Sequence, residues 1–395
     1  MGGRLIKFAL AAAIAFCQTH AQGPVVDRSS VTTRDRLEDT GWWPTKGEPE
    51  RSQYVGSETC SGCHRAIAAL QETTPMYHAG VRAGQSEILQ KHDQLNFQES
   101  GFRYSLVRTQ EGGVTFSVSN GEERTGADAV WAFGAGEIGQ TYVLEKGDDY
   151  IEGRLSYFTR LDSLSITIGH PAKPPEKLEE ALGQRMYGGT AQHCFGCHTT
   201  ASTTSLRFEP EKATPGVTCE SCHGPGARHV AAMNGQVDSQ SATAILNPAH
   251  LSSADSVDFC GACHRTSADV TAVMPANIGV LSVRFQPYRL EKSRCWKENG
   301  DARITCIACH DPHQPLVRED RAYDSKCLAC HSAQPGPRVQ AGAKTTCRAA
   351  TSNCVSCHMP KYEVPQANAA FTDHFIRVVS KEQKGSGRTG GFAGR

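Results

Sequence analysis

One five-residue pattern, Cys-x-x-Cys-His, occurs seven times and limits what this 395-residue chain can fold into. Two cysteines separated by two residues and followed directly by histidine form the attachment pattern for haem c. Each thiol can form a thioether with one haem vinyl group, and the adjacent histidine can then bind the iron as its proximal ligand. The seven copies are Cys60, Cys63 and His64; Cys194, Cys197 and His198; Cys219, Cys222 and His223; Cys260, Cys263 and His264; Cys306, Cys309 and His310; Cys327, Cys330 and His331; and Cys354, Cys357 and His358.

Other chemistry based on paired cysteines fits this pattern poorly. Structural zinc sites also use Cys-x-x-Cys, but they do not require a histidine directly after every second cysteine. A thioredoxin-like redox pair is a single motif in a βαβ context, not a series of seven. The pattern therefore predicts seven covalently attached haem c groups and a multihaem protein.

The spacing of the motifs predicts the fold class. Six motifs lie between Cys194 and His358, and the 165 residues of that segment are too few for a layered core around each haem. We therefore expect mainly short α-helices and loops wrapped around a stacked multihaem array. Regular secondary structure should be low, with one small β-rich insert.

The N-terminus predicts export. Arg4 and Lys7 precede an apolar run over 8–16, and a small-residue cleavage site favours residues 1–21 as a signal peptide. The apolar run is too short to span a membrane. Because haem c is attached outside the cytoplasm, we expect a periplasmic or extracellular protein. Residues 22–53 lack an apolar period and are interpreted as a linker or extended arm.

The rest of the chain divides by pattern. Residues 54–100 form the first haem-binding segment, and 101–170 form the β-rich insert. Residues 171–365 form the six-haem region, and 366–395 a C-terminal segment with a distal ligand and a disordered tail. In the insert, alternating residues predict a hairpin over 102–106 and 114–118, with further strands at 129–133, 141–145, 151–158 and 164–168.

The insert also contains a Gly-x-Gly-x-x-Gly sequence over 134–139, which resembles a dinucleotide-binding fingerprint. That fingerprint requires a helix after the glycines. Residues 141–144 instead have the composition of a strand, so we interpret the glycines as turn residues.

Seven histidines are assigned as proximal ligands, and eight more remain in the mature chain. His313 lies only three residues after His310, too close to reach the distal face of the same haem, so it should bind a neighbouring iron. His229, six residues after His223, invites the same argument. The candidate distal ligands are His78, His229, His313, His374, His170, His193 and His250, whereas His92 lies among polar residues and is expected to face solvent.

Two further sulfur assignments remain open. Cys295 and Cys347 lie outside the motifs, and in an exported protein they could form a disulfide or stay as two buried thiols. Methionine ligation through Met76, Met186 or Met274 is an alternative that no pattern favours.

Four segments resemble the cytochrome c-554-related family of multihaem cytochromes. They are C-E-S-C-H-G-P-G-A-R-H over 219–229, T-C-I-A-C-H-D-P-H over 305–313, C-V-S-C-H-M-P-K over 354–361 and T-D-H-F-I-R over 372–377. The resemblance covers roughly residues 54–378. It implies mostly bis-histidine haems in closely stacked pairs, with His229, His313 and His374 at positions that resemble the family's distal ligands.

Three functions are compatible with these features. The first is an electron carrier that works with redox partner proteins, since a bis-histidine iron has no open coordination site. The second is a multihaem oxidoreductase that acts on a small nitrogen or sulfur compound at one open haem. The third is a subunit of an extracellular haem filament or another homo-oligomer. The formal net charge of zero gives no indication of nucleic-acid binding.

Overall fold

The computed structural model describes residues 49–187, 189–237, 245–273, 278–296, 303–331 and 350–379. The predicted signal peptide, most of the 22–53 arm, Cys347 and the C-terminal tail lie outside these residues. In the described part, no helix is long and apolar enough to cross a membrane.

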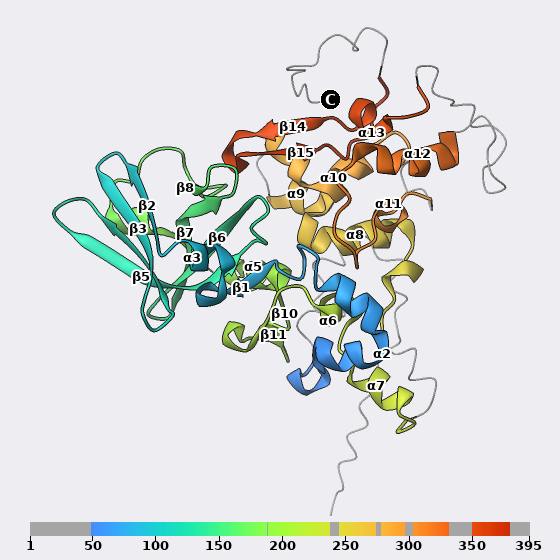
Figure 1. Cartoon of the computed structure of the whole chain (residues 1–395), viewed down its shortest axis with the longest axis horizontal. Helices are drawn as coiled ribbons and strands as arrows, with labels where there is room; N and C mark the ends of the chain where they lie inside the picture. The colour runs from blue at the N-terminus through green and yellow to red at the C-terminus, as the bar shows by residue number, and fades with distance from the viewer. Residues whose placement is uncertain are drawn as a thin grey trace, which may run out of the picture.

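The largest element is a nine-stranded antiparallel sheet that runs from Gly80 to Arg185 (Figure 1). Its strand order is β2-β3-β4-β5-β6-β7-β8, with β1 paired to β5 and β9 paired to β7. The strands are β1 Gly80–Arg82, β2 Gln94–Glu99, β3 Phe102–Arg108, β4 Val114–Ser119, β5 Arg124–Phe133, β6 Gly139–Lys146, β7 Asp149–Phe158, β8 Ser163–Ile166 and β9 Gly183–Arg185. Strands β2 and β8, at the two ends of the path, also contact each other, so the sheet curls nearly into a barrel.

This sheet corrects the predicted fold class. The expectation of mainly short helices with a small β-rich insert and low regular secondary structure is wrong, because the sheet is a large unit with its own core. The six strands expected from alternation are confirmed as β3 to β8. The short strands β1, β2 and β9 were missed: β2 is mostly polar, and β1 and β9 have three residues each, too few for a periodic signal.

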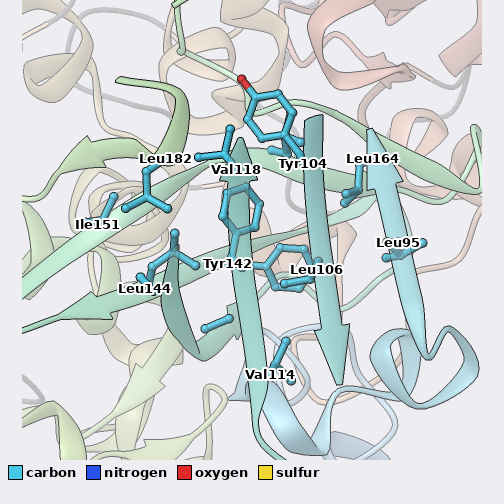
Figure 2. Close-up of a cluster of buried hydrophobic side chains, with 14 of the residues drawn as sticks. Leu95, Tyr104, Leu106, Val114, Val118, Tyr142, Leu144, Ile151, Leu164 and Leu182 are labelled. Carbon is cyan, nitrogen blue, oxygen red and sulfur yellow. The ribbon is translucent and has the colours of Figure 1, made fainter. Parts of the chain in front are cut away.

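Alternating side chains build the core of the sheet. Phe102, Tyr104 and Leu106 of β3 are 8%, 2% and 1% exposed and point to the same face. In the register of β3 with β4, Tyr104 lies opposite Val118, and these side chains pack in the interior (Figure 2). The short helix α4, Leu178–Leu182, adds its buried residues to the same core.

The glycine-rich sequence over 134–139 forms the turn from β5 to β6. Gly134 and Gly136 have φ values of 111° and 80°, which glycine adopts without strain. Strand β6 begins at Gly139, where a dinucleotide-binding fingerprint would begin a helix. The interpretation of these residues as turn glycines is confirmed.

The cysteine motifs lie on seven helices beside the sheet (Figure 1). These helices are α2 Gly56–Gln71, α5 Thr190–His198, α6 Cys219–His223, α8 Ser253–His264, α11 Cys306–Cys309, α12 Asp324–His331 and α13 Cys354–His358. Besides α4, the other α-helices of the described part are α3 Glu87–Lys91, α7 Ala227–Met233, α9 Ser267–Val273 and α10 Gln286–Glu291. Three two-stranded pairs complete the fold: β10 Thr199–Thr200 with β13 Thr214–Pro215, β11 Thr203–Thr204 with β12 Arg207–Phe208, and β14 Lys361–Val364 with β15 Ala369–Thr372.

Two ion pairs join the sheet to the helical part. Arg160, after β7, lies 2.8 Å from Glu363 of β14. Glu137, in the β5–β6 turn, pairs with Arg318, which precedes α12. Because these side chains are exposed, the contacts orient the sheet against the helices and contribute little to overall stability.

Candidate haem-binding sites

In most of these helices, the Cys-x-x-Cys-His motif forms the last turn. The two cysteines are three residues apart, so they share one face of the helix, and the histidine follows directly. Helices α5, α6, α8, α12 and α13 end at the motif histidine, and α11 ends one residue before it. In the longer helix α2, His64 has non-helical φ and ψ values of −104° and 39°, so the chain also turns there.

Backbone carbonyls orient three of the motif histidines. The Nδ1 atoms of His198, His223 and His358 lie 2.8, 2.8 and 2.7 Å from the carbonyl oxygens of Ala79, Leu246 and Arg377. An Nδ1–H group that donates to a carbonyl places the lone pair on Nε2, which is the arrangement that a metal-binding histidine requires. These three residues therefore fit the role of iron ligand.

His310 has a different second contact. Its Nδ1 lies 3.4 Å from the hydroxyl of Tyr323, which donates its own proton to the carbonyl of Val317 at 2.7 Å. The Tyr323 oxygen therefore accepts a weak hydrogen bond from the imidazole. A weaker acceptor leaves the imidazole less electron-rich than those bonded to carbonyls.

Tyr323→Phe should therefore change the haem held by His310 only slightly. Loss of the weak bond is expected to raise the midpoint potential of this haem by less than ~59 mV. For one electron, that limit corresponds to a tenfold change in the equilibrium constant for reduction. Spectropotentiometric titration of the purified holoprotein measures this shift. A larger shift, or loss of the haem from the intact mass, would show that Tyr323 does more than accept this bond.

Three pairs of imidazole rings have their centroids at the separation expected of two axial ligands on one iron. The ring centroids of His64 and His229 are 6.5 Å apart, and their planes differ by 23°. For His223 and His313 the values are 6.0 Å and 10°. Two imidazoles that bind one metal from opposite sides, each with a bond of about 2.0 Å, place their ring centres roughly 6 Å apart.

The third pair is His310 and His374, whose centroids are 6.2 Å apart with planes at 43°. Burial lowers the pKa of His374 to about 4, so its imidazole is neutral at pH 7 and can bind a metal. In each pair, the second histidine belongs to a different motif segment from the first. His229, His313 and His374 follow the motifs that begin at Cys219, Cys306 and Cys354. The structure places His313 opposite His223 and not opposite His310; that it binds iron stays a prediction.

The remaining candidate ligands have other surroundings. His170 is 6% exposed, and its Nε2 lies 3.2 Å from Glu152. His193 is exposed, and its Nε2 lies 2.7 Å from Arg265. His78 and His250 are exposed, and in the described part of the chain neither they nor His170 faces a motif histidine.

His92 is half-buried, with its ring tilted against that of Tyr157 and its Nε2 3.5 Å from Asp162. The expectation that it faces solvent is therefore only partly met. Its contacts all lie within the sheet domain, so it has no place among the motif helices.

Cysteines from different motifs lie beside each other. Cys60 and Cys219 are hydrogen-bonding neighbours, as are Cys260 and Cys306, and Cys327 and Cys354. The helices α2 and α6, α8 and α11, and α12 and α13 therefore pack as three pairs.

A buried carboxylate holds the first of these pairs together. Glu220 is 3% exposed and is the only charged residue between the two cysteines of any motif. Its carboxylate accepts hydrogen bonds from the backbone N–H groups of Val55 and Gly56, both at 2.9 Å, and of Gly226 at 2.8 Å. Glu220 thereby holds two segments against α6: the start of α2, and the segment that leads to His229.

Asp324 has the same role between α12 and α13. Its two carboxylate oxygens accept from the backbone N–H groups of Asn353 and Cys354 at 2.7 and 2.8 Å. These bonds hold its pKa below the usual value for aspartate, because they stabilise the charged form. The start of α12 is thus fixed to the start of α13.

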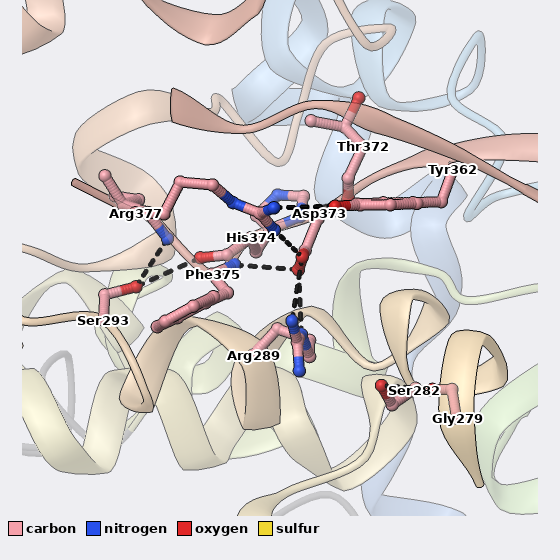
Figure 3. Close-up of polar contacts among 11 residues, drawn as sticks. Gly279, Ser282, Arg289, Ser293, Tyr362, Thr372, Asp373, His374, Phe375 and Arg377 are labelled. Carbon is pink, nitrogen blue, oxygen red and sulfur yellow. Dashed lines mark hydrogen bonds and ion pairs between the residues drawn. The ribbon is translucent and has the colours of Figure 1, made fainter. Parts of the chain in front are cut away.

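Asp373 forms the third such centre and is fully buried, at 0% exposure. Its carboxylate accepts from Arg289 at 2.8 Å through two atoms, from Arg377 at 2.5 Å and from the backbone N–H of Phe375 at 3.0 Å (Figure 3). The next residue is His374, and the carbonyl of Arg377 accepts from His358. One buried ionic cluster therefore positions two histidines of different sites.

Comparison with known proteins finds similarity to c-type cytochromes. Residues 170–224 match the family model of cytochrome c554 and c-prime. The multihaem cytochrome MtrA of Shewanella baltica (strain OS185) is 24% identical over 213 residues, which cover 44% of this chain and 63% of MtrA. The chain is a multihaem c-type cytochrome. The match spans less than two thirds of the length of MtrA.

One solved structure also resembles this cytochrome. The crystal structure of the outer cell wall cytochrome OcwA aligns over 83% of this chain and 80% of OcwA, with a TM-score of 0.45 and 16% sequence identity. Similarity at this level is too low to transfer the arrangement of one chain to the other.

Proposed function

We propose that this cytochrome is an exported electron carrier with seven haem c groups, most of them bound by two histidines. The observation that carries the proposal is the set of three opposing imidazole pairs, each with one histidine of a Cys-x-x-Cys-His motif. An iron with two histidine ligands has no open position, so it can exchange electrons but cannot bind a substrate. Redox partner proteins would supply and remove these electrons.

The contacts among the motif helices support one continuous relay. Helix α2 contacts α6, α8 contacts α11, and α12 contacts α13. Cys222 lies near Cys260, so the first pair is close to the second, and Cys309 lies near Cys327, so the second pair is close to the third. Electrons would pass in the order α2, α6, α8, α11, α12 and α13, or in reverse.

Helix α5 forms a branch of this relay. Cys197 lies 3.4 Å from the carbonyl of Ala262 in α8, so the haem of α5 would meet the relay at α8. On its other side, Phe133 of the sheet stacks on His198 with ring centroids 4.7 Å apart and planes at 8°. The sheet therefore covers the imidazole of His198 and would restrict access of water and partners to a haem held there.

The mature protein should carry seven haems and accept seven electrons. Intact-mass measurement should show seven haem increments above residues 22–395, because every motif has both cysteines and its histidine in place. Reductive titration should consume about seven electrons per chain. The reduced protein should bind carbon monoxide poorly, and nitrite, hydroxylamine or sulfite should not reoxidise it rapidly. Fewer than seven haems, or rapid reoxidation together with a high-spin ferric signal, would contradict the proposal of an electron carrier.

A further inference from the structure

Two arginines and a motif histidine line a small cavity at the end of α8. The cavity has a volume of about 230 Å³ and is bounded by Cys263, His264, Arg265, Arg284 and Phe285. His264 is the last residue of α8, and Arg265 follows it with a φ of 68°, in the left-handed region. Arg284 ends the 3₁₀-helix η7, Gly279–Arg284, and thus reaches the cavity from a separate element.

The two guanidinium groups lack a counter-ion in the described part of the chain. No carboxylate there pairs with either arginine, and the Nε of Arg284 is buried without a hydrogen-bond partner. Burial and the proximity of Arg265 lower the pKa of Arg284. Arg265 contacts a neutral atom instead, the Nε2 of His193 at 2.7 Å.

An anion bound between the two guanidinium groups would therefore make this arrangement more favourable. A guanidinium binds a planar carboxylate with two parallel hydrogen bonds, and Nε is one of the atoms that donates them. Each haem c brings two propionate carboxylates, and the haem of α8 would be held by His264 at the edge of this cavity. A dissolved oxyanion such as nitrite has the same chemistry and is the alternative source.

We propose that Arg265 and Arg284 form a carboxylate-binding site beside His264, and that a propionate of the haem attached at Cys260 and Cys263 occupies it. This inference rests on the proposed haem at α8 and identifies residues that bind its edge. The two positive charges would neutralise the propionate and raise the potential of this haem relative to one with unpaired propionates. A haem that sits where the α5 branch joins the relay would then hold its electron longer.

The test uses the full-length holoprotein with Arg284→Gln, which removes the charge and retains a polar side chain. Loss of one positive charge beside the haem should lower its reduction equilibrium constant about tenfold, which is ~59 mV for one electron. Arg284→Lys keeps the charge and should restore most of the shift. Arg103→Gln removes an exposed arginine from the outer face of the sheet and should leave all potentials unchanged.

The outcomes separate this inference from the proposed function. Unchanged potentials in Arg284→Gln and Arg265→Gln, with seven haems present by mass, would overturn the carboxylate site and leave the electron carrier intact. A wild-type protein without a haem at Cys260 and Cys263 would instead refute the proposed function. If nitrite or sulfite shifts the spectrum of the wild type but not of Arg284→Gln, the occupant is a dissolved oxyanion and the propionate assignment is wrong.

Discussion

His313→Ala should convert one low-spin haem to a high-spin haem while all seven haems remain attached. The affected haem is the one attached at Cys219 and Cys222, because His313 faces His223 with ring centroids 6.0 Å apart and planes only 10° from parallel. His313 itself is half-exposed, so its removal leaves an open coordination position and little cavity. Electron paramagnetic resonance of the oxidised protein should show one new high-spin ferric signal.

Two further results belong to the same prediction. The reduced mutant should bind one equivalent of carbon monoxide, because water in the open position is displaced easily. His92→Ala is the matched control: it removes a histidine that contacts Asp162 and Tyr157 within the sheet domain, and the spectrum should not change. If the low-spin signals of His313→Ala match those of the wild type, His313 is not a ligand.

The sequence predicted the β-strands where side chains alternate and failed where the strands are short or polar. Strand β3 was predicted from Phe102, Tyr104 and Leu106. Every second residue is apolar there, and in a strand these side chains point to the same face of the sheet. The size of the sheet could not be predicted from the alternation of apolar residues within single strands. It depends on the pairing of β1 with β5, of β9 with β7, and on the contact of β2 with β8. Each of these long-range contacts involves one strand with a weak local signal.

The haem-binding residues were likewise predictable from the sequence only in part. The motif residues were evident because thioether chemistry fixes their spacing, whereas the surroundings of each histidine depend on packing. Glu220 could have been noticed as the only charged residue inside a motif, but its three backbone partners come from α2 and from the segment before α7. Asp324 had no sequence signal, and Asp373 stood out only as part of the segment over 372–377, since an isolated aspartate is usually a solvated surface residue.

Asp373→Asn should strongly destabilise the C-terminal part of the cytochrome and disturb two haems together. The substitution removes the negative charge that lies between Arg289 and Arg377, whose side chains are only 12% and 26% exposed. Loss of one partner from a buried ion pair leaves an uncompensated charge, and typical costs are about 3–5 kcal/mol. Thermal unfolding of the holoprotein, followed by circular dichroism, should show a clear fall in the transition temperature.

The spectroscopic result distinguishes this cluster from an ordinary stabilising contact. His374 directly follows Asp373 and faces His310, while Arg377 accepts from His358 through its carbonyl, so the haems of α11 and α13 should both change their low-spin signals. Asp320→Asn is the control, because it breaks a more exposed pair with Lys361 and should cost at most about 1 kcal/mol. A mutant that unfolds like the wild type, or alters neither haem, would show that Asp373 does not position these ligands.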